Sequence, residues 1–189
     1  TLSGSVTGSD ILLHYPSRDQ PNRPRLRTSL KEPAMSDTLE IAPDFTLPVQ
    51  GADESEITLS DLRGTPVVMF FYPRDDTSGC TKENEAFTAM ESDFAALGVR
   101  VFGISKDSMA SHELFMTKKS LTVPLLSDEN GSASEDFGVW KEKNMYGKKY
   151  MGIERTTYLI DANGSIAMVW PKVKVPGHAE AVLAAVQAL

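Results

Sequence analysis

The chain has 189 residues, 41% of them apolar, which is enough to build the core of one domain. Its net charge of -7 argues against nucleic-acid binding, because displacing phosphate counterions requires a surface of clustered Lys and Arg. No apolar stretch approaches the roughly 18 residues of a membrane-spanning helix, so we expect no membrane association. A single cysteine cannot form an internal disulfide, which favours a cytoplasmic protein.

The first 34 residues differ in composition from the rest of the chain. They hold five Arg and Lys against three Asp and Glu, a local charge of +2, which leaves -9 for the remainder. They are rich in Pro, Ser and Arg, and they have too few apolar residues to offset the entropy cost of ordering. We therefore predict a disordered extension over residues 1–34 and a folded domain over residues 35–189. Whether the extension is a targeting segment stays open.

Within the folded domain, apolar periodicity predicts alternating strands and helices. In chain order these are an edge segment at 43–48, strands at 57–59 and 66–72, a helix at 80–97, a strand at 99–105, a helix at 108–120 with Leu114 and Phe115 inward, a strand at 123–127, a short helix at 133–137, strands at 154–161 and 165–170, and a helix at 179–189.

The order of these elements indicates the fold class. Strands that alternate with helices form parallel pairs through crossovers, whereas the turn at Asn163-Gly164 joins two strands as an antiparallel hairpin. The result is an α/β protein with a central mixed β-sheet flanked by helices. This arrangement is the thioredoxin-like fold.

The only cysteine follows a buried strand directly. The apolar run at 67–72 leads through a polar turn to Cys80 at the start of the helix. The aligned peptide dipoles place positive charge at a helix N-terminus, which favours the thiolate over the thiol. Thr77 precedes it by three residues, and its hydroxyl is placed to donate to the sulfur or to an oxygen bound beside it. This spacing is typical of a nucleophile.

Attack of a sulfur anion on a peroxide requires an ionised thiol, hydrogen-bond donors, stabilisation of the leaving oxygen and limited water access. Cys80 and Thr77, with the free backbone N–H groups of the helix start, supply the first two. Pro73 offers an apolar shield without an N–H group. Arg155 is the candidate cation, since a guanidinium stays protonated, but sequence distance alone does not place it near the sulfur.

Each of these residues also has a purely structural interpretation. A lone cysteine is most often a small buried apolar side chain, and Thr77 could act only as a helix N-cap. Arg155 could be a surface charge, and Glu83 could simply favour the helix dipole. Asp75 and Asp76 are most simply a solvated turn, and the three histidines are too scattered to form a ligand set. We therefore expect no metal and no cofactor.

The motif Pro73-x-x-x-Thr77-x-x-Cys80 resembles the signature of the peroxiredoxins, thiol peroxidases of thioredoxin-like fold. With the segments at 70–83, 138–140, 152–161 and 173–178, the chain resembles the peroxiredoxin Q group, also called bacterioferritin comigratory protein, over residues 38–189. The resemblance implies that Cys80 is the peroxidatic cysteine, with Thr77 and Arg155 as activating donors. It also implies that Pro73 is a shield and Glu83 a supporting residue.

One position departs from the pattern of that group. Many members have a resolving cysteine five residues after the peroxidatic one, where this chain has Glu85. The resemblance therefore implies a one-cysteine mechanism, in which a sulfenic acid formed at Cys80 is reduced by thioredoxin, glutaredoxin or a small thiol.

The expected substrates of such a protein are hydrogen peroxide and organic hydroperoxides, and the expected oligomeric state is a monomer. The alternative is a non-enzymatic peroxide sensor or holdase. A disulfide oxidoreductase is a weaker alternative than either of these, because the chain has no second cysteine to form a Cys-x-x-Cys pair.

Overall fold

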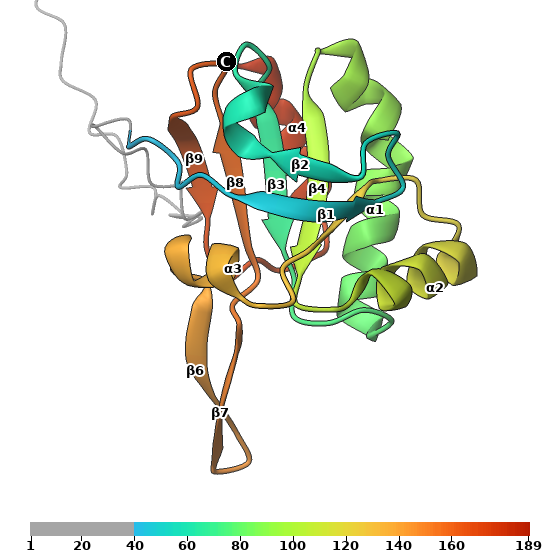
Figure 1. Cartoon of the computed structure of the whole chain (residues 1–189), viewed down its shortest axis with the longest axis vertical. Coiled ribbons are helices and arrows are strands. Elements are labelled where there is room, and N and C mark those ends of the chain that lie inside the picture. Colours follow the sequence, from blue (N-terminus) through green and yellow to red (C-terminus); the bar gives the residue numbers. More distant parts are fainter. Residues whose placement is uncertain (1–39) are drawn as a thin grey trace, which may run out of the picture. The chain divides into compact units, whose positions relative to one another are not determined.

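The computed structural model describes residues 40–189, and the extension predicted over residues 1–34 lies outside this part of the chain. The described residues form a seven-stranded mixed sheet with helices on both faces (Figure 1). Its strands, in spatial order, are β2 (Glu56–Thr58), β1 (Thr46–Gln50), β5 (Leu125–Ser127), β4 (Arg100–Ser105), β3 (Val67–Phe71), β8 (Thr156–Ile160) and β9 (Ile166–Trp170). The helices are α1 (Ser78–Ala96), α2 (Met109–Lys119), α3 (Ser132–Asp136) and α4 (His178–Gln187), with a 3-10 helix η1 at Leu59–Leu62.

The predicted mixture of parallel and antiparallel strands is confirmed. The crossovers through α1 and α2 make β3, β4 and β5 parallel neighbours, whereas β8 runs antiparallel to both β3 and β9. The predicted hairpin at 154–161 and 165–170 is the β8–β9 pair. The central position of β3 explains its continuous apolar sequence, since a strand covered on both faces has no solvated side.

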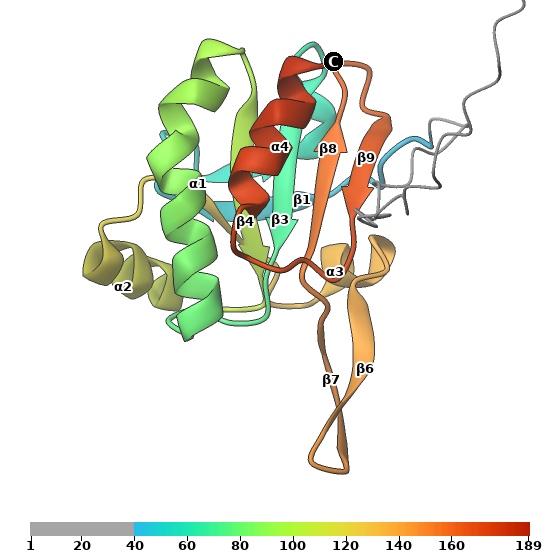
Figure 2. The ribbon, with the colours of Figure 1, turned by 180° about the vertical axis from the view of Figure 1, so that it is seen from behind.

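Side chains of β3 and the residue that follows it alternate between two cores. Val68, Phe70 and Tyr72 pack in one core, on the face covered by α1 and α4, which lie side by side in Figure 2. In this core the ring of Phe70 stacks on that of Phe87 in α1, with centroids 4.3 Å apart. This stacking fixes the middle of α1 on the strand that precedes it.

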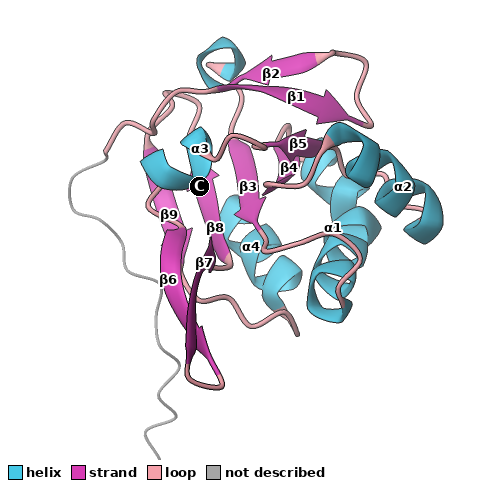
Figure 3. Ribbon diagram, turned by 60° about the horizontal axis from the view of Figure 1, so that its bottom comes forward, coloured by secondary structure: helices cyan, strands magenta, loops and turns pink. Residues whose placement is uncertain are grey.

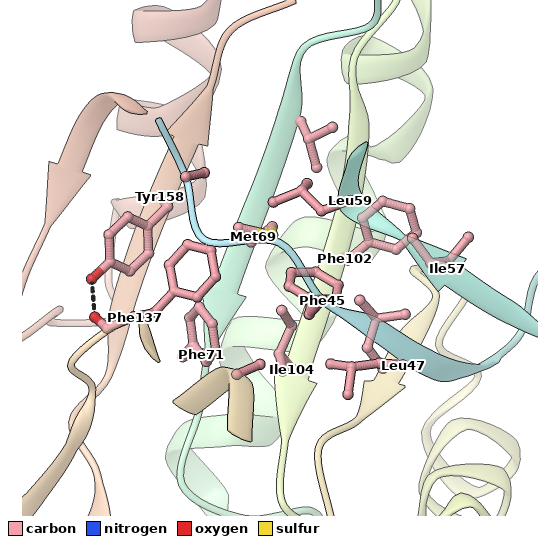
Figure 4. Close-up of a cluster of buried hydrophobic side chains, with 14 of the residues drawn as sticks. Phe45, Leu47, Ile57, Leu59, Met69, Phe71, Phe102, Ile104, Phe137 and Tyr158 are labelled. Carbon is pink, nitrogen blue, oxygen red and sulfur yellow. Dashed lines mark hydrogen bonds between the residues drawn. The ribbon is translucent and has the colours of Figure 1, made fainter. Parts of the chain in front are cut away.

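The opposite face of β3 forms the second core, together with β1 and α3 (Figure 4). The ring of Phe71 packs against those of Phe137 and Tyr158, with centroids 5.4 Å and 5.9 Å away. The Tyr158 hydroxyl donates to the carbonyl oxygen of Phe137 at 2.6 Å. These contacts fix β8 beside the C-terminal end of β3.

A second, two-stranded sheet is absent from the sequence prediction. It consists of β6 (Trp140–Met145) and β7 (Lys148–Ile153), and it projects from the end of the main sheet (Figures 1 and 3). Most of its side chains are exposed, and Tyr146 at its tip is 99% exposed. A strand pair without a buried face has no alternating apolar pattern, so periodicity did not indicate it.

One apolar residue predicted to face inward is exposed. Leu114 in α2 is 73% exposed, although its neighbour Phe115 is buried. Adjacent helical residues point about 100° apart, so one helix face buries only one of the two. Leu97, the C-cap of α1, is 43% exposed. Within residues 40–189, none of the helices has the length and apolar character required to cross a membrane.

Candidate active site

Cys80 is the third residue of α1 and lies beyond the C-terminal end of β3. The Thr81 N–H donates to the carbonyl oxygen of Thr77 at 2.8 Å, which forms the first turn of the helix. The Cys80 side chain is free and 1% exposed, and it packs in the core that contains Tyr72 and Phe87. The thiol is therefore held at a helix N-terminus and sheltered from bulk water.

Arg155 reaches this sulfur because of the sheet topology. It precedes β8, whose antiparallel register pairs Thr156 with Phe71 at the end of β3. Arg155, which precedes Thr156, thus lies near the C-terminal end of β3, where the chain continues towards Cys80. Arg155 Nη2 donates to Cys80 Sγ at 3.2 Å. The structure brings together two residues that the sequence could only pair by resemblance.

Glu83 holds the other side of the guanidinium. It lies nearly one turn after Cys80 and is 1% exposed, and its Oε2 accepts a hydrogen bond from Arg155 Nη1. Its Oε1 is buried and has no partner within the described part of the chain. Burial raises the pKa of Glu83 to about 7, although the charge of Arg155 opposes this shift. Burial also disfavours the charge of Arg155, but Glu83 and Cys80 outweigh it and raise the pKa of Arg155.

Thr77 occupies the predicted N-cap position, but its hydroxyl is used differently from the prediction. It donates to the carbonyl oxygen of Arg74 at 3.2 Å and does not cap the helix. The expected hydrogen bond from Thr77 to the sulfur is therefore not the one formed here. The hydroxyl instead closes the turn between Arg74 and the helix. Thr77 and Pro73 are both exposed, so they form the solvent side of the site.

A cavity of about 980 Å³ opens beside this turn. Pro73 and Thr77 line it on one side, and residues of the β6–β7 hairpin line it on the other. The Lys143 ammonium donates to the carbonyl oxygen of Ile153 at the base of the hairpin. Burial, followed by the charge of Arg155, lowers the pKa of Lys143. The β6–β7 hairpin, which the sequence did not predict, thus forms one wall of the candidate site.

The expectation of a solvated turn at Asp75 is wrong. Asp75 is 8% exposed, and it accepts hydrogen bonds from the Tyr72 hydroxyl at 2.7 Å and the Ser111 hydroxyl at 2.8 Å. Its Oδ2 also lies 2.9 Å from Nδ1 of His112, which is fully buried. Burial opposes the charge of Asp75, but His112 and the hydrogen bonds lower its pKa. The loop before Cys80 is therefore fixed to α2.

The neighbouring Asp76 is exposed, as expected, and its Oδ2 lies 2.5 Å from the Lys118 ammonium. No sequence pattern links Asp75 to His112, because the two residues meet only through the packing of α2. The signal available in the sequence was His112, a polar residue on the buried face of α2, which indicates a buried polar partner. Within residues 40–189 there is no group of three or more His, Cys, Asp or Glu side chains arranged to hold a metal ion.

A second buried histidine lies near the site. His178, at the start of α4, is 7% exposed, and its Nε2 is 2.8 Å from the Thr157 hydroxyl oxygen. Burial, followed by the charge of Arg155, lowers the pKa of His178 to about 4. This side chain is therefore neutral at physiological pH. The sequence predicts a helix after His178 but no role for its side chain.

Comparisons with known proteins agree with this site. Residues 39–169 match the model of the AhpC/TSA family. The putative peroxiredoxin bcp of Coxiella burnetii is 53% identical over 72% of this chain and 89% of that relative. Peroxiredoxin Bcp of Escherichia coli is 40% identical over 76% of this chain and 91% of that relative.

Solved structures show the same relationship. The structure of Xanthomonas campestris peroxiredoxin Q superimposes with a TM-score of 0.72 at 43% identity, covering 76% of this chain and 90% of that one. The thioredoxin-like fold and the resemblance stated from the sequence are thereby confirmed. With a single cysteine at the start of α1, the chain belongs to the AhpC/TSA family as a peroxiredoxin of the Q, or Bcp, group.

Proposed function

We propose that this chain is a thiol-dependent peroxidase that reduces hydrogen peroxide and organic hydroperoxides through Cys80. The main support is the hydrogen bond from Arg155 Nη2 to Cys80 Sγ at 3.2 Å. A guanidinium at that distance is a cationic hydrogen-bond donor to the attacking sulfur, and it offers further N–H donors to a bound peroxide. The relatives are named peroxiredoxins, and alkyl peroxide reduction activity is described for the bacterioferritin comigratory protein of Xanthomonas campestris.

The reaction begins with attack of the Cys80 thiolate on one peroxide oxygen. An S–O bond forms and the O–O bond breaks, so that sulfur is oxidised by two electrons to a sulfenic acid. The departing oxygen takes a proton and leaves as water or an alcohol. Arg155 stabilises the negative charge that develops on this oxygen, and donors that are already in place add no reorganisation cost.

The remaining site residues have supporting roles in this proposal. Thr77 offers its hydroxyl to the bound peroxide after leaving the Arg74 carbonyl, and Pro73 shields the sulfur from water. Glu83 is a positioning residue, because it orients the Arg155 guanidinium without touching the sulfur. The catalytic domain is proposed to extend over residues 35–189.

Reduction of the sulfenic acid requires a thiol from another molecule. Glu85 stands at the position of the resolving cysteine and is exposed, and the chain has no second cysteine. Thioredoxin, glutaredoxin or a small thiol would attack the sulfur of Cys80 and release water. We propose a cytoplasmic location, because a reducing compartment supplies such thiols. We also propose that the protein is a monomer.

The test is peroxide consumption by the wild type and by Cys80→Ser, with thioredoxin, glutaredoxin and small thiols as reductants. We expect turnover with at least one reductant in the wild type and none in the variant. Turnover that survives in Cys80→Ser would remove this residue from the mechanism. No turnover of the wild type with any of these thiols would favour the alternative, a peroxide sensor or holdase.

A further inference from the structure

The cavity beside the active site has a charge opposite to that of the whole protein. The chain has a net charge of -7, yet no Asp or Glu among residues 40–189 lines this cavity. Its cationic lining residues are Arg74, Lys106, Lys143, Lys148 and Lys149. A hydroperoxide is neutral, so the peroxidase step does not account for five cations at one site.

Several of these cations are available to a bound anion. Lys149 pairs with Glu142 at 3.0 Å, but within residues 40–189 no ion pair is formed by Arg74, Lys106 or Lys148. Charges of one sign in a concave site reinforce one another and attract the opposite charge from solution. The cavity therefore favours an anionic molecule.

The same cavity has apolar surface between its cations. Trp140 and Ile153 line it at the base of the hairpin, and Tyr150 and Met151 line it further along β7. Lys106 Nζ lies 4.4 Å from the centroid of the Trp140 ring, which holds that ammonium at the cavity. The volume of about 980 Å³ lies at the upper end of the roughly 300–1,000 Å³ of small-molecule sites. This is more space than a small peroxide occupies.

The position of the cavity links it to the sulfur chemistry. Pro73 and Thr77, which flank the turn into α1, form one of its walls. Lys143, on the opposite wall, donates to the carbonyl oxygen of Ile153, two residues before Arg155. A molecule bound between these walls therefore contacts the turn that leads into Cys80, although the sulfur itself does not line the cavity.

We infer that this cavity binds the reductant, and that the reductant is a small anionic thiol, a cysteine-containing peptide with free carboxylates. The inference rests on the proposed function, because only a sulfenic acid at Cys80 requires such a thiol. The carboxylates pair with Arg74 and Lys148, since charge-assisted hydrogen bonds to carboxylates are strong. The peptide packs on Trp140. The β6–β7 hairpin, which forms one wall of this cavity, projects from the end of the main sheet (Figure 1).

The proposed reduction takes two steps. The first thiol attacks the sulfur of the Cys80 sulfenic acid, so that an S–S bond forms, the S–O bond breaks and water leaves. A second thiol then attacks the bound thiol's sulfur in this mixed disulfide. Cys80 leaves as a thiolate, and the two small thiols depart as one disulfide. The two electrons given by these thiols are the two that the peroxide took from Cys80.

Glutathione is a suitable probe, and its diethyl ester is the matched control. The ester has the same cysteine but no carboxylate charge. In a double-mixing experiment, Cys80 is first oxidised with one equivalent of hydrogen peroxide, and the decay of the sulfenic acid is then followed with each thiol at equal thiolate concentration. We expect glutathione to react about tenfold faster than its diester at low salt, because the cations steer only the anion. Added salt should reduce the difference.

A matched pair of variants tests the location of the site. Lys148→Glu reverses a charge at the cavity, whereas Arg63→Glu makes the same change at the opposite end of β3, next to η1. We expect Lys148→Glu to slow reduction by glutathione about three- to tenfold. Reduction by the diester, and both reactions of Arg63→Glu, should stay near the wild-type rates.

The outcomes separate this inference from the proposed function. Failure of Cys80 to form a sulfenic acid in the first mixing step would overturn the proposed function and the inference together. Rapid oxidation followed by equal rates with glutathione and its diester would overturn the inference alone. Reduction only by thioredoxin or glutaredoxin would do the same, and it would identify a protein as the reductant.

Discussion

Arg155 donates a hydrogen bond from Nη2 to Cys80 Sγ at 3.2 Å and another from Nη1 to the buried carboxyl group of Glu83. The contact with Cys80 spans 75 residues of sequence and depends on the antiparallel pairing of β8 with β3. One side chain thereby connects the sulfur to an acid buried beside it in α1. The position of the guanidinium is fixed from two directions.

Replacing Arg155 should impair oxidation of the thiol more than folding. We expect Arg155→Gln to lower the second-order rate of Cys80 oxidation by hydrogen peroxide about 100-fold, since a preorganised cationic donor is lost. Arg155→Lys keeps the charge but cannot contact both partners, so a loss of about tenfold is expected. Stopped-flow mixing measures both rates, with Arg63→Gln as the control. A wild-type rate in Arg155→Gln would exclude this role.

The raised pKa of Glu83 predicts a stability that decreases with pH. Its folded-state pKa of about 7 exceeds the ordinary value of 4.5, so the folded protein binds the proton more tightly than the unfolded chain. This contribution is complete below pH 4.5 and is lost as pH rises through 7. The loss should reach about 3 kcal/mol in wild type and be absent in Glu83→Gln. Urea unfolding across this range measures it, and parallel pH profiles would contradict the assignment.

His178 predicts the opposite trend in acid. Its folded-state pKa of about 4 lies below the ordinary 6.5, so the unfolded chain binds the proton more tightly. The contribution is present above pH 6.5 and is lost as pH falls through 4. Thermal or urea unfolding should show wild type losing about 3 kcal/mol more than His178→Gln over that interval. Equal acid sensitivity of the two proteins would show that His178 is not held neutral by the fold.

The pair formed by Asp75 and His112 should couple the active-site loop to α2. Asp75→Asn and His112→Asn are each expected to lower the free energy of unfolding by about 3 kcal/mol, because each leaves a buried polar partner without its counterpart. The double variant should lose less than the sum, by about 1 kcal/mol or more. Urea denaturation of all four proteins gives the coupling. Strict additivity would mean that the two side chains do not stabilise one another.

Local patterns in the sequence were sufficient for most elements of the fold. The apolar run of β3 and the helix that begins near Cys80 follow from residues adjacent in the chain, as does the β8–β9 hairpin. Their signals are local because strand alternation, helix periodicity and turn residues act over a few positions. The β6–β7 hairpin gave no such signal, since its strands are exposed.

The sequence by itself determined the nucleophile: one cysteine, at the start of a helix, in a motif with Pro73 and Thr77. Only the tertiary structure decided which distant side chains surround it. Arg155 meets Cys80 because β8 pairs with β3, and Asp75 is buried because α2 brings His112 to it. Long-range pairings of this kind depend on strand register and helix packing, which no local run of residues specifies.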